Sequence, residues 1–434
     1  MMIVKNINKT NPFYLTSQCP PLVLFFTILL SLNSENSYSQ KTIYQDPFLP
    51  YLSGKTPEIT RDLGTETIDG IKVHRLVFLS RTIETSSGPV PTTVYAAIAF
   101  PVGPGKHAAL LRLHGGGGAA DIPAAVSSAK EGYVSLVLDI PGVTGKSVKN
   151  DATNGAWITR EKITANPDPT YSALFDAVVA SIDAFYLLKS QPEVDPNKIS
   201  IAGASWGGYV ATMLAGLLDK DIAATWSVFG SGNFLKGAFE KQNIEKLPAA
   251  EKEMWLKYLD PGLRAGKITK PYFINTASND RHWSWMAVQA TIADMKGPTN
   301  QFFSPNENHK VSYPGTGKMI EFLNHYVRKT GPPLPLVFIE KAKKMKDGSI
   351  SVSVKASQIH NITEAKIYYS IANPDWTERE WKEVGILTKN GKMEAVIPAI
   401  NPSSGIDFYA IITDQDMAWR TEKCSVSSLI RHSK

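Results

Sequence analysis

Residues 198–210 read KISIAGASWGGYV. A run of β-forming residues, Lys198–Ala202, leads into GASWG at 203–207, and a helix-forming run, Tyr209–Leu218, follows. A G-x-S-x-G pattern between a strand and a helix is typical of a sharp turn that exposes one serine hydroxyl. The serine backbone in such a turn is strained, and a side chain two residues before or after it would collide with the neighbouring strand or helix. We therefore expect Ser205 to be a nucleophile at a strand end.

Strand-like and helix-like runs alternate from Lys72 to Arg328, which indicates an α/β architecture. The apolar runs are continuous, as in a mostly parallel sheet that is buried on both faces. Helices are expected at Tyr171–Ser190 and Met319–Arg328, and the first two strands should form an antiparallel pair. The expected strands are Val73–Leu79, Thr93–Phe100, Ala108–Leu113, Val134–Asp139, Ile199–Ala202, Ala223–Val228, Tyr272–Thr276 and Gln301–Ser304. With the turn at Ser205, this order resembles the α/β-hydrolase fold, a doubly wound sheet.

The pattern changes after a stiff proline-rich linker, GPPLP, at residues 331–335. Beyond the linker, short runs of alternating residues are separated by turn residues such as Lys346-Asp347-Gly348. Strands at this spacing are typical of a small all-β, Ig-like sandwich. We therefore predict an α/β-hydrolase catalytic domain at residues 40–331 and a β-sandwich domain at residues 334–434.

The first 39 residues have the features of a secretory signal peptide. Lys5 and Lys9 precede a short apolar run, Pro21–Leu32, and small residues stand before an expected cut after Ser39. The apolar run is too short for a comfortable membrane span. We therefore expect a secreted or periplasmic protein that has no membrane span after cleavage. Cleavage leaves Cys424 as the one cysteine, so no internal disulfide is expected.

Composition and charge argue against several classes of function. The 434-residue chain has a formal net charge of +6, but its lysines and arginines are scattered, so we expect no nucleic-acid partner. The sequence has no phosphate loop and no dinucleotide fingerprint, and no metal motif is recognised. We therefore expect neither a cofactor nor a metal. The sequence leaves the oligomeric state open.

Two residues downstream of Ser205 are placed to complete a catalytic set. A serine hydroxyl is a poor nucleophile at neutral pH and needs an adjacent base, which in turn needs an orienting acid. In α/β-hydrolases the acid and then the histidine follow the serine along the chain. Asp280 and His309 each follow one of the expected strands, so we predict Ser205, Asp280 and His309 as the catalytic residues. Glu307 is the alternative acid.

The run HGGGG at 114–118 follows an expected strand and matches the loop that supplies a backbone donor to the oxyanion. Consecutive glycines let the backbone approach a substrate closely. The negative charge formed on attack needs such preorganised donors. We predict that the N–H groups of Gly116 and Trp206 form the oxyanion hole, and that His114 braces the loop.

Several tryptophans fall in or next to the loops that should surround the pocket. Aromatic platforms suit sugar rings and aryl acyl groups, whereas packing between the loops is the alternative interpretation. The residues predicted to contact the substrate are Gly117, Trp157 and Trp283.

The glycine loop at 114–118, GASWGG around Ser205, NDRHW at 279–283 and Asn308-His309 together resemble the acetyl xylan esterase and dienelactone hydrolase branch of the α/β-hydrolases. The resemblance covers roughly Thr60–Lys329. It implies a secreted serine esterase that removes acyl groups, acetyl above all, from a carbohydrate or another small ester through an acyl-enzyme on Ser205. GASWGGY also resembles the prolyl oligopeptidase catalytic domain, so a serine peptidase is the alternative. A non-catalytic binding protein is a third interpretation, against which the intact catalytic set argues.

Overall fold

The structure is a computed structural model that describes residues 45–145, 152–312, 318–357, 361–400, 405–415 and 423–433. The predicted signal peptide lies outside these residues. In the described part of the chain, no helix has the length and apolar character needed to cross a membrane.

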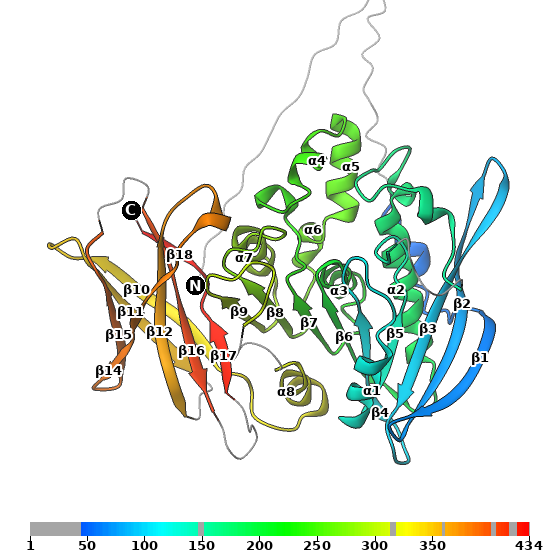
Figure 1. The fold of residues 1–434 in the computed structure, drawn as a ribbon, viewed down its shortest axis with the longest axis horizontal. Coiled ribbons are helices and arrows are strands. Elements are labelled where there is room, and N and C mark those ends of the chain that lie inside the picture. Colours follow the sequence, from blue (N-terminus) through cyan, green and yellow to red (C-terminus); the bar gives the residue numbers. More distant parts are fainter. Residues whose placement is uncertain are drawn as a thin grey trace, which may run out of the picture. The chain divides into compact units, whose positions relative to one another are not determined.

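A nine-stranded sheet carries the first two thirds of the described chain (Figure 1). Its strand order is β1-β2-β3-β5-β4-β6-β7-β8-β9. The strands β1 to β3 are antiparallel, β3 is also antiparallel to β5, and the remaining pairs are parallel. The bounds are β1 Ile59–Ile68, β2 Ile71–Thr85, β3 Gly88–Phe100, β4 His107–Leu113, β5 Tyr133–Leu138, β6 Val194–Ala204, β7 Ala224–Val228, β8 Tyr272–Ala277 and β9 Thr299–Ser304.

Helices cover both faces of this sheet. The strand register shows that α3 lies on one face and that α1 and α8 lie on the other. Leu113 and Gly203 are aligned in β4 and β6, and a side chain at Gly203 would meet α3. Arg112 points to the opposite face, where it donates to Ser128 of α1. Trp226 of β7 lies on that same face and packs against α8. The bounds are α1 Ile122–Lys130, α2 Ala173–Lys189, α3 Trp206–Leu217, α4 Lys241–Glu245, α5 Ala249–Leu259, α6 Gly262–Ala265, α7 Trp285–Ala293 and α8 Met319–Leu323.

The chain has the α/β-hydrolase fold that the sequence predicts, with two local differences. An extra edge strand, β1, precedes the expected antiparallel pair, and nine of its ten residues are exposed. The expected last helix begins at Met319, but α8 ends at Leu323 and the backbone continues as a π-helix over Asn324–Arg328.

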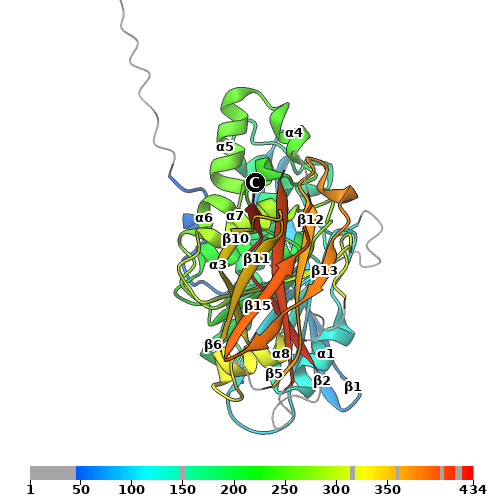
Figure 2. The ribbon, with the colours of Figure 1, turned by 90° about the vertical axis from the view of Figure 1, so that its left-hand side faces the viewer.

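The remaining strands form two antiparallel sheets, a β-sandwich as predicted (Figure 2). One sheet has the order β10-β11-β15-β14, and the other has the order β13-β12-β16-β17, with β18 pairing with β16. The bounds are β10 Leu336–Lys344, β11 Ile350–Ser357, β12 Ile362–Ile371, β13 Lys382–Gly385, β14 Leu387–Lys389, β15 Lys392–Ile397, β16 Ile406–Asp414, β17 Cys424–Ser427 and β18 Arg431–Ser433.

The sandwich packs directly against the edge strand β9 of the large sheet, where β17 lies beside it (Figure 1). The Phe303 N–H in β9 donates to the Ser427 hydroxyl in β17, at 2.9 Å. Gln289 in α7 exchanges two hydrogen bonds with the backbone of Ile430. The described residues from Gln45 onward accordingly form one compact unit.

Candidate active site

Ser205 occupies the sharp turn between β6 and α3. Its backbone has φ 55° and ψ −120°, a strained conformation for a residue with a side chain, as the sequence predicts. A Cβ at Gly203 would lie 2.1 Å from the Gly207 carbonyl oxygen, and a Cβ at Gly207 would lie 2.2 Å from the Leu113 carbonyl oxygen. The two glycines are therefore required for the strand, turn and helix to pack this closely.

The structure brings the side chains of Ser205, His309 and Asp280 into one hydrogen-bonded chain. His309 Nε2 lies 3.1 Å from Ser205 Oγ, and His309 Nδ1 lies 3.0 Å from Asp280 Oδ2. Each residue stands at the carboxyl end of a strand: Ser205 after β6, Asp280 after β8 and His309 after β9. In this arrangement the imidazole can take the hydroxyl proton while the carboxylate holds its other nitrogen. The alternative acid, Glu307, has its carboxylate 3.7 Å from Lys310 Nζ.

The Asp280 carboxylate is fully buried and is held by backbone donors as well as by the imidazole. Its Oδ1 accepts from the N–H groups of His282, at 2.7 Å, and Trp283, at 3.2 Å. A buried carboxylate is costly unless it is hydrogen-bonded. These two bonds therefore hold the carboxylate in place and orient Oδ2 toward His309.

Three aromatic rings fix the plane of the His309 imidazole. The ring of Phe229 lies 4.2 Å from it between centroids, that of His282 lies 4.5 Å away at a steep angle, and that of Trp283 stacks at 6.1 Å. Burial lowers the pKa of His282, and repulsion from His309 adds to that effect. Sequence reasoning gave no role to Phe229 or His282. The signal available for Phe229 was its place directly after a buried strand.

The glycine loop lies against the serine. A Cβ at Gly115 would be 3.3 Å from Ser205 Cβ, and one at Gly116 would be 2.9 Å from the Trp206 ring. The N–H groups of Gly116 and Trp206 donate to no other described residue, so both remain able to bind an oxyanion. The Gly117 N–H donates instead to the Val143 carbonyl, at 2.9 Å.

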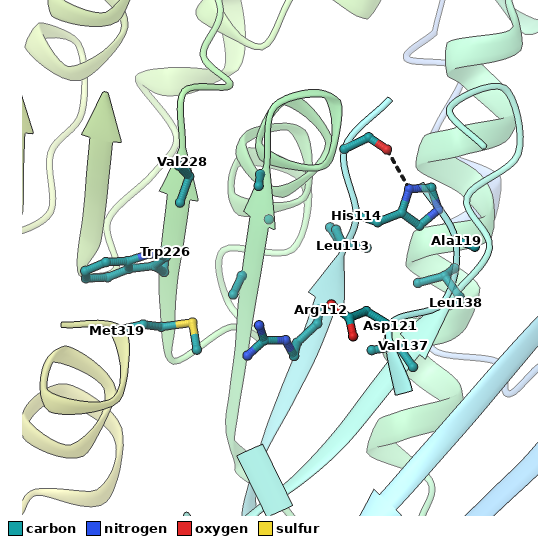
Figure 3. A pocket seen from close by; sticks show the side chains of 14 residues that line it. Arg112, Leu113, His114, Ala119, Asp121, Val137, Leu138, Trp226, Val228 and Met319 are labelled. Atoms are coloured by element: carbon teal, nitrogen blue, oxygen red, sulfur yellow. Dashed lines mark hydrogen bonds between the residues drawn. The ribbon is translucent and has the colours of Figure 1, made fainter. Parts of the chain in front are cut away.

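His114 braces the glycine loop, as expected. Its Nδ1 lies 2.7 Å from the Gly115 carbonyl oxygen (Figure 3). Its Nε2 accepts from the Ile140 N–H at 2.9 Å. The pKa of His114 is lowered, chiefly because burial disfavours the charged ring. A neutral ring with its proton on Nδ1 satisfies both bonds at once.

Behind this loop, on the face of the sheet that carries α1 and α8, lies a cavity of about 420 Å³ (Figure 3). Arg112 and Asp121 line one side of it, and Trp226 and Met319 line the other. Ser205 is not among the residues that line it, so this cavity is separate from the exposed side of the nucleophile.

The two tryptophans predicted to contact the substrate are both buried. Trp283 is 1% exposed and packs on Trp206 and His309. Trp157 is 7% exposed and lies in a 3-10 helix, Ala156–Thr159. Little ring surface is open on either side chain, and substrate contact by Gly117, Trp157 and Trp283 stays a prediction. In the described part of the chain, no group of three or more His, Cys, Asp or Glu residues is placed to hold a metal.

Residues 66–262 match the model of the family described as acetyl xylan esterase (AXE1). The match is consistent with the resemblance of the sequence to the acetyl xylan esterase branch of the α/β-hydrolases. The family match supports an esterase.

Two solved structures are similar to this chain. The acetyl xylan esterase from Paenibacillus sp. R4 has 19% sequence identity, covers 64% of this chain and 91% of its own, and gives a TM-score of 0.49. Acetyl xylan esterase 1 from Thermoanaerobacterium sp. JW/SL YS485 has 17% identity, covers 63% of this chain and 90% of its own, and gives a TM-score of 0.51. Among curated proteins, the search found no match.

Proposed function

We propose that this protein is a serine carboxylic-ester hydrolase that removes acyl groups, acetyl above all, from a carbohydrate. The observation that carries the proposal is the hydrogen-bonded chain from Ser205 through His309 to Asp280, set beside two backbone donors. The family match supports an esterase, and the two solved structures named above are acetyl xylan esterases.

In the acylation step, Ser205 Oγ attacks the carbonyl carbon of the ester while His309 Nε2 takes the hydroxyl proton. Asp280 holds Nδ1–H and stabilises the imidazolium that forms. The oxyanion accepts hydrogen bonds from the N–H groups of Gly116 and Trp206. Collapse of this intermediate breaks the bond to the alcohol oxygen, which leaves with the proton from Nε2, and the acyl group stays on Ser205.

In the deacylation step, a water molecule takes the place of the alcohol. His309 Nε2 removes a proton from the water as its oxygen attacks the acyl carbon, and the same backbone donors bind the second oxyanion. Collapse returns the proton to Ser205 Oγ and releases the carboxylic acid. The enzyme is restored with no change of oxidation state and no cofactor.

We also propose that residues 1–39 are removed as a signal peptide, which places the enzyme in the periplasm or outside the cell. The basic flank, the short apolar run and the small residues before the cut support this proposal. Mass spectrometry of the exported protein should find a mature chain that begins at Gln40. A mature chain that still carries the apolar run would contradict it.

The test of the enzymatic proposal compares Ser205→Ala with the wild type on p-nitrophenyl acetate, acetylated xylan and aminoacyl-p-nitroanilides. We expect the wild type to cleave the acetyl esters and Ser205→Ala to lose a factor of about 10⁶ in kcat, because the nucleophile is gone. Asp280→Asn should lose about 10⁴, since the imidazole is then held in the wrong tautomer. Exchange of an exposed serine, Ser87→Ala, is the matched control and should change nothing. Full activity in Ser205→Ala would refute the mechanism, and cleavage of the anilides alone would show a peptidase.

A further inference from the structure

The loops that carry Asp280 and His309 touch a segment of the C-terminal sandwich. This segment, residues 376–381, lies between β12 and β13 and begins with a 3-10 helix, Trp376–Glu378. We call it the bracing segment. It contacts both loops through hydrogen bonds, and these bonds link residues that are far apart in the sequence.

The loop that carries Asp280, which we call the acid loop, is held at two neighbouring residues. The indole Nε1–H of Trp376 donates to the Asp280 carbonyl oxygen at 2.7 Å. The side-chain amide of Asn279 donates to the carbonyl oxygens of Thr377, at 3.1 Å, and Arg379, at 2.6 Å. The far edge of the Trp376 ring also lies close to Gly237, where a Cβ would be 3.3 Å away. The backbone that presents the Asp280 carboxylate is therefore fixed from the sandwich side.

The loop that carries His309, which we call the base loop, is held by one asparagine. Asn306 Oδ1 accepts from the Trp381 N–H at 2.7 Å, and Asn306 Nδ2 donates to the Trp381 carbonyl at 2.9 Å. The backbone of Asn306 is left-handed, with φ 57°, and so is that of His309, with φ 40°. Left-handed conformations are costly for residues with side chains and persist only where the surroundings enforce them. The paired bonds to Trp381 are such an enforcement.

The two loops are also joined to each other. The Asn279 N–H donates to the Glu307 carbonyl at 3.1 Å, and the Arg281 N–H donates to Asn308 Oδ1 at 3.0 Å. A displacement of either loop would therefore be transmitted to the other.

The bracing segment is itself anchored within the sandwich. The buried guanidinium of Arg379 pairs with Asp407 of β16 and donates to the Asn373 carbonyl. Its charge also lies 5.5 Å from the ring centre of Trp285 and 5.9 Å from that of Trp381. A buried ion pair of this kind specifies one position for the backbone that carries it.

We propose that the bracing segment positions the Asp280 and His309 loops, with Trp376 as the principal positioning residue. This inference rests on the proposed function of the same site. Transfer of the serine proton needs the donor and acceptor atoms held within about 0.5 Å of their productive positions, and a misplacement of about 1 Å can cost about 10²-fold in rate. The sandwich is thus a working part of the esterase site.

The test uses Trp376→Phe, which removes the indole donor and keeps an aromatic ring. The readouts are kcat and KM on p-nitrophenyl acetate and the labelling rate of Ser205 by a fluorophosphonate, which needs an activated serine but no particular acyl group. We expect kcat and the maximal labelling rate to fall about tenfold, with KM and the half-saturating probe concentration within twofold.

The matched control is Trp255→Phe. This exchange also removes an indole donor to a backbone carbonyl, that of Lys162 at 3.2 Å, but Trp255 lies in α5, outside both loops and the bracing segment. We expect it to lower the melting temperature while kcat and labelling stay within twofold of the wild type. A second variant, Asn279→Ala, removes the amide bonds to the segment and should slow labelling as Trp376→Phe does.

The outcomes separate the two proposals. Labelling of Trp376→Phe and Asn279→Ala at the wild-type rate, with the wild type itself labelled at Ser205, would overturn the positioning role and leave the esterase proposal intact. Equal losses in Trp376→Phe and Trp255→Phe would also overturn it, because general loosening would then explain both. Failure of the wild type to be labelled would overturn the proposed function, and the positioning role with it.

Discussion

The exchange Gly203→Ala tests whether the turn at Ser205 depends on close backbone packing. The added Cβ would lie 2.1 Å from the Gly207 carbonyl oxygen, 2.4 Å from Gly207 C and 2.9 Å from Gly208 N, whereas real Cβ contacts essentially never fall under 3.0 Å. The groups it meets are backbone atoms of α3 and cannot rotate away. The helix start must therefore shift by roughly 1 Å, which moves Ser205 Oγ and the Trp206 N–H away from their partners. We expect a loss of about 10²-fold in kcat and about 1–3 kcal/mol in the free energy of unfolding.

The assay is kcat on p-nitrophenyl acetate together with urea unfolding, each compared with Gly385→Ala. Gly385 lies in β13, and a Cβ there meets no atom within 4 Å, so this control adds the same methyl group without a collision. It should leave kcat unchanged. Gly203→Ala with a kcat within twofold of the wild type would refute the packing argument.

Two further predictions concern buried polar groups. Burial raises the pKa of Asp183 from 3.8 to about 7, and the hydrogen bond from Ser80 opposes this shift only in part. The folded state therefore binds the carboxyl proton more tightly than the unfolded state does. The stability that this proton contributes is fully present below pH about 4 and is lost as the pH rises through about 7. Asp183→Asn should therefore raise the free energy of unfolding in urea by up to about 4 kcal/mol at pH 8 and by almost nothing at pH 4; an equal gain at both would contradict the assignment. Tyr209→Phe removes a buried hydroxyl that donates to the Leu259 carbonyl at 2.6 Å. This exchange should lower the free energy of unfolding in urea by about 1–2 kcal/mol. An unchanged free energy of unfolding would show that the bond does not stabilise the fold.

Local patterns were enough to predict the turn at Ser205, the glycine loop and the strand ends that carry Asp280 and His309. Each of these features depends on a few adjacent residues whose backbone conformation is restricted, as the left-handed Ser205 shows. The mostly parallel sheet followed from continuous apolar runs, because both of its faces are covered by helices.

Features that depend on contacts between different segments of the chain were not predicted from the sequence. The exposed strand β1 has no apolar face of its own and is defined by its pairing with β2. The short strands β13, β14 and β18 are only three or four residues long, and each is likewise defined by its pairing with a neighbouring strand. The side-chain amide of Asn279 donates to the carbonyl oxygens of Thr377 and Arg379. Every residue has a backbone carbonyl, so the sequence does not indicate which of them will accept such a bond.

The contacts between the acid loop and the bracing segment join residues 96 to 100 positions apart. Synthesis proceeds from the N-terminus at about 5–20 residues per second, so a ribosome finishes the nucleophile and its histidine well before residue 381 emerges. If the bracing segment positions the two loops as proposed, a nascent chain that has formed its sheet but lacks this segment has reduced esterase activity. On the proposed positioning role, full hydrolytic activity therefore requires that translation has passed residue 381 and that this part of the sandwich has folded.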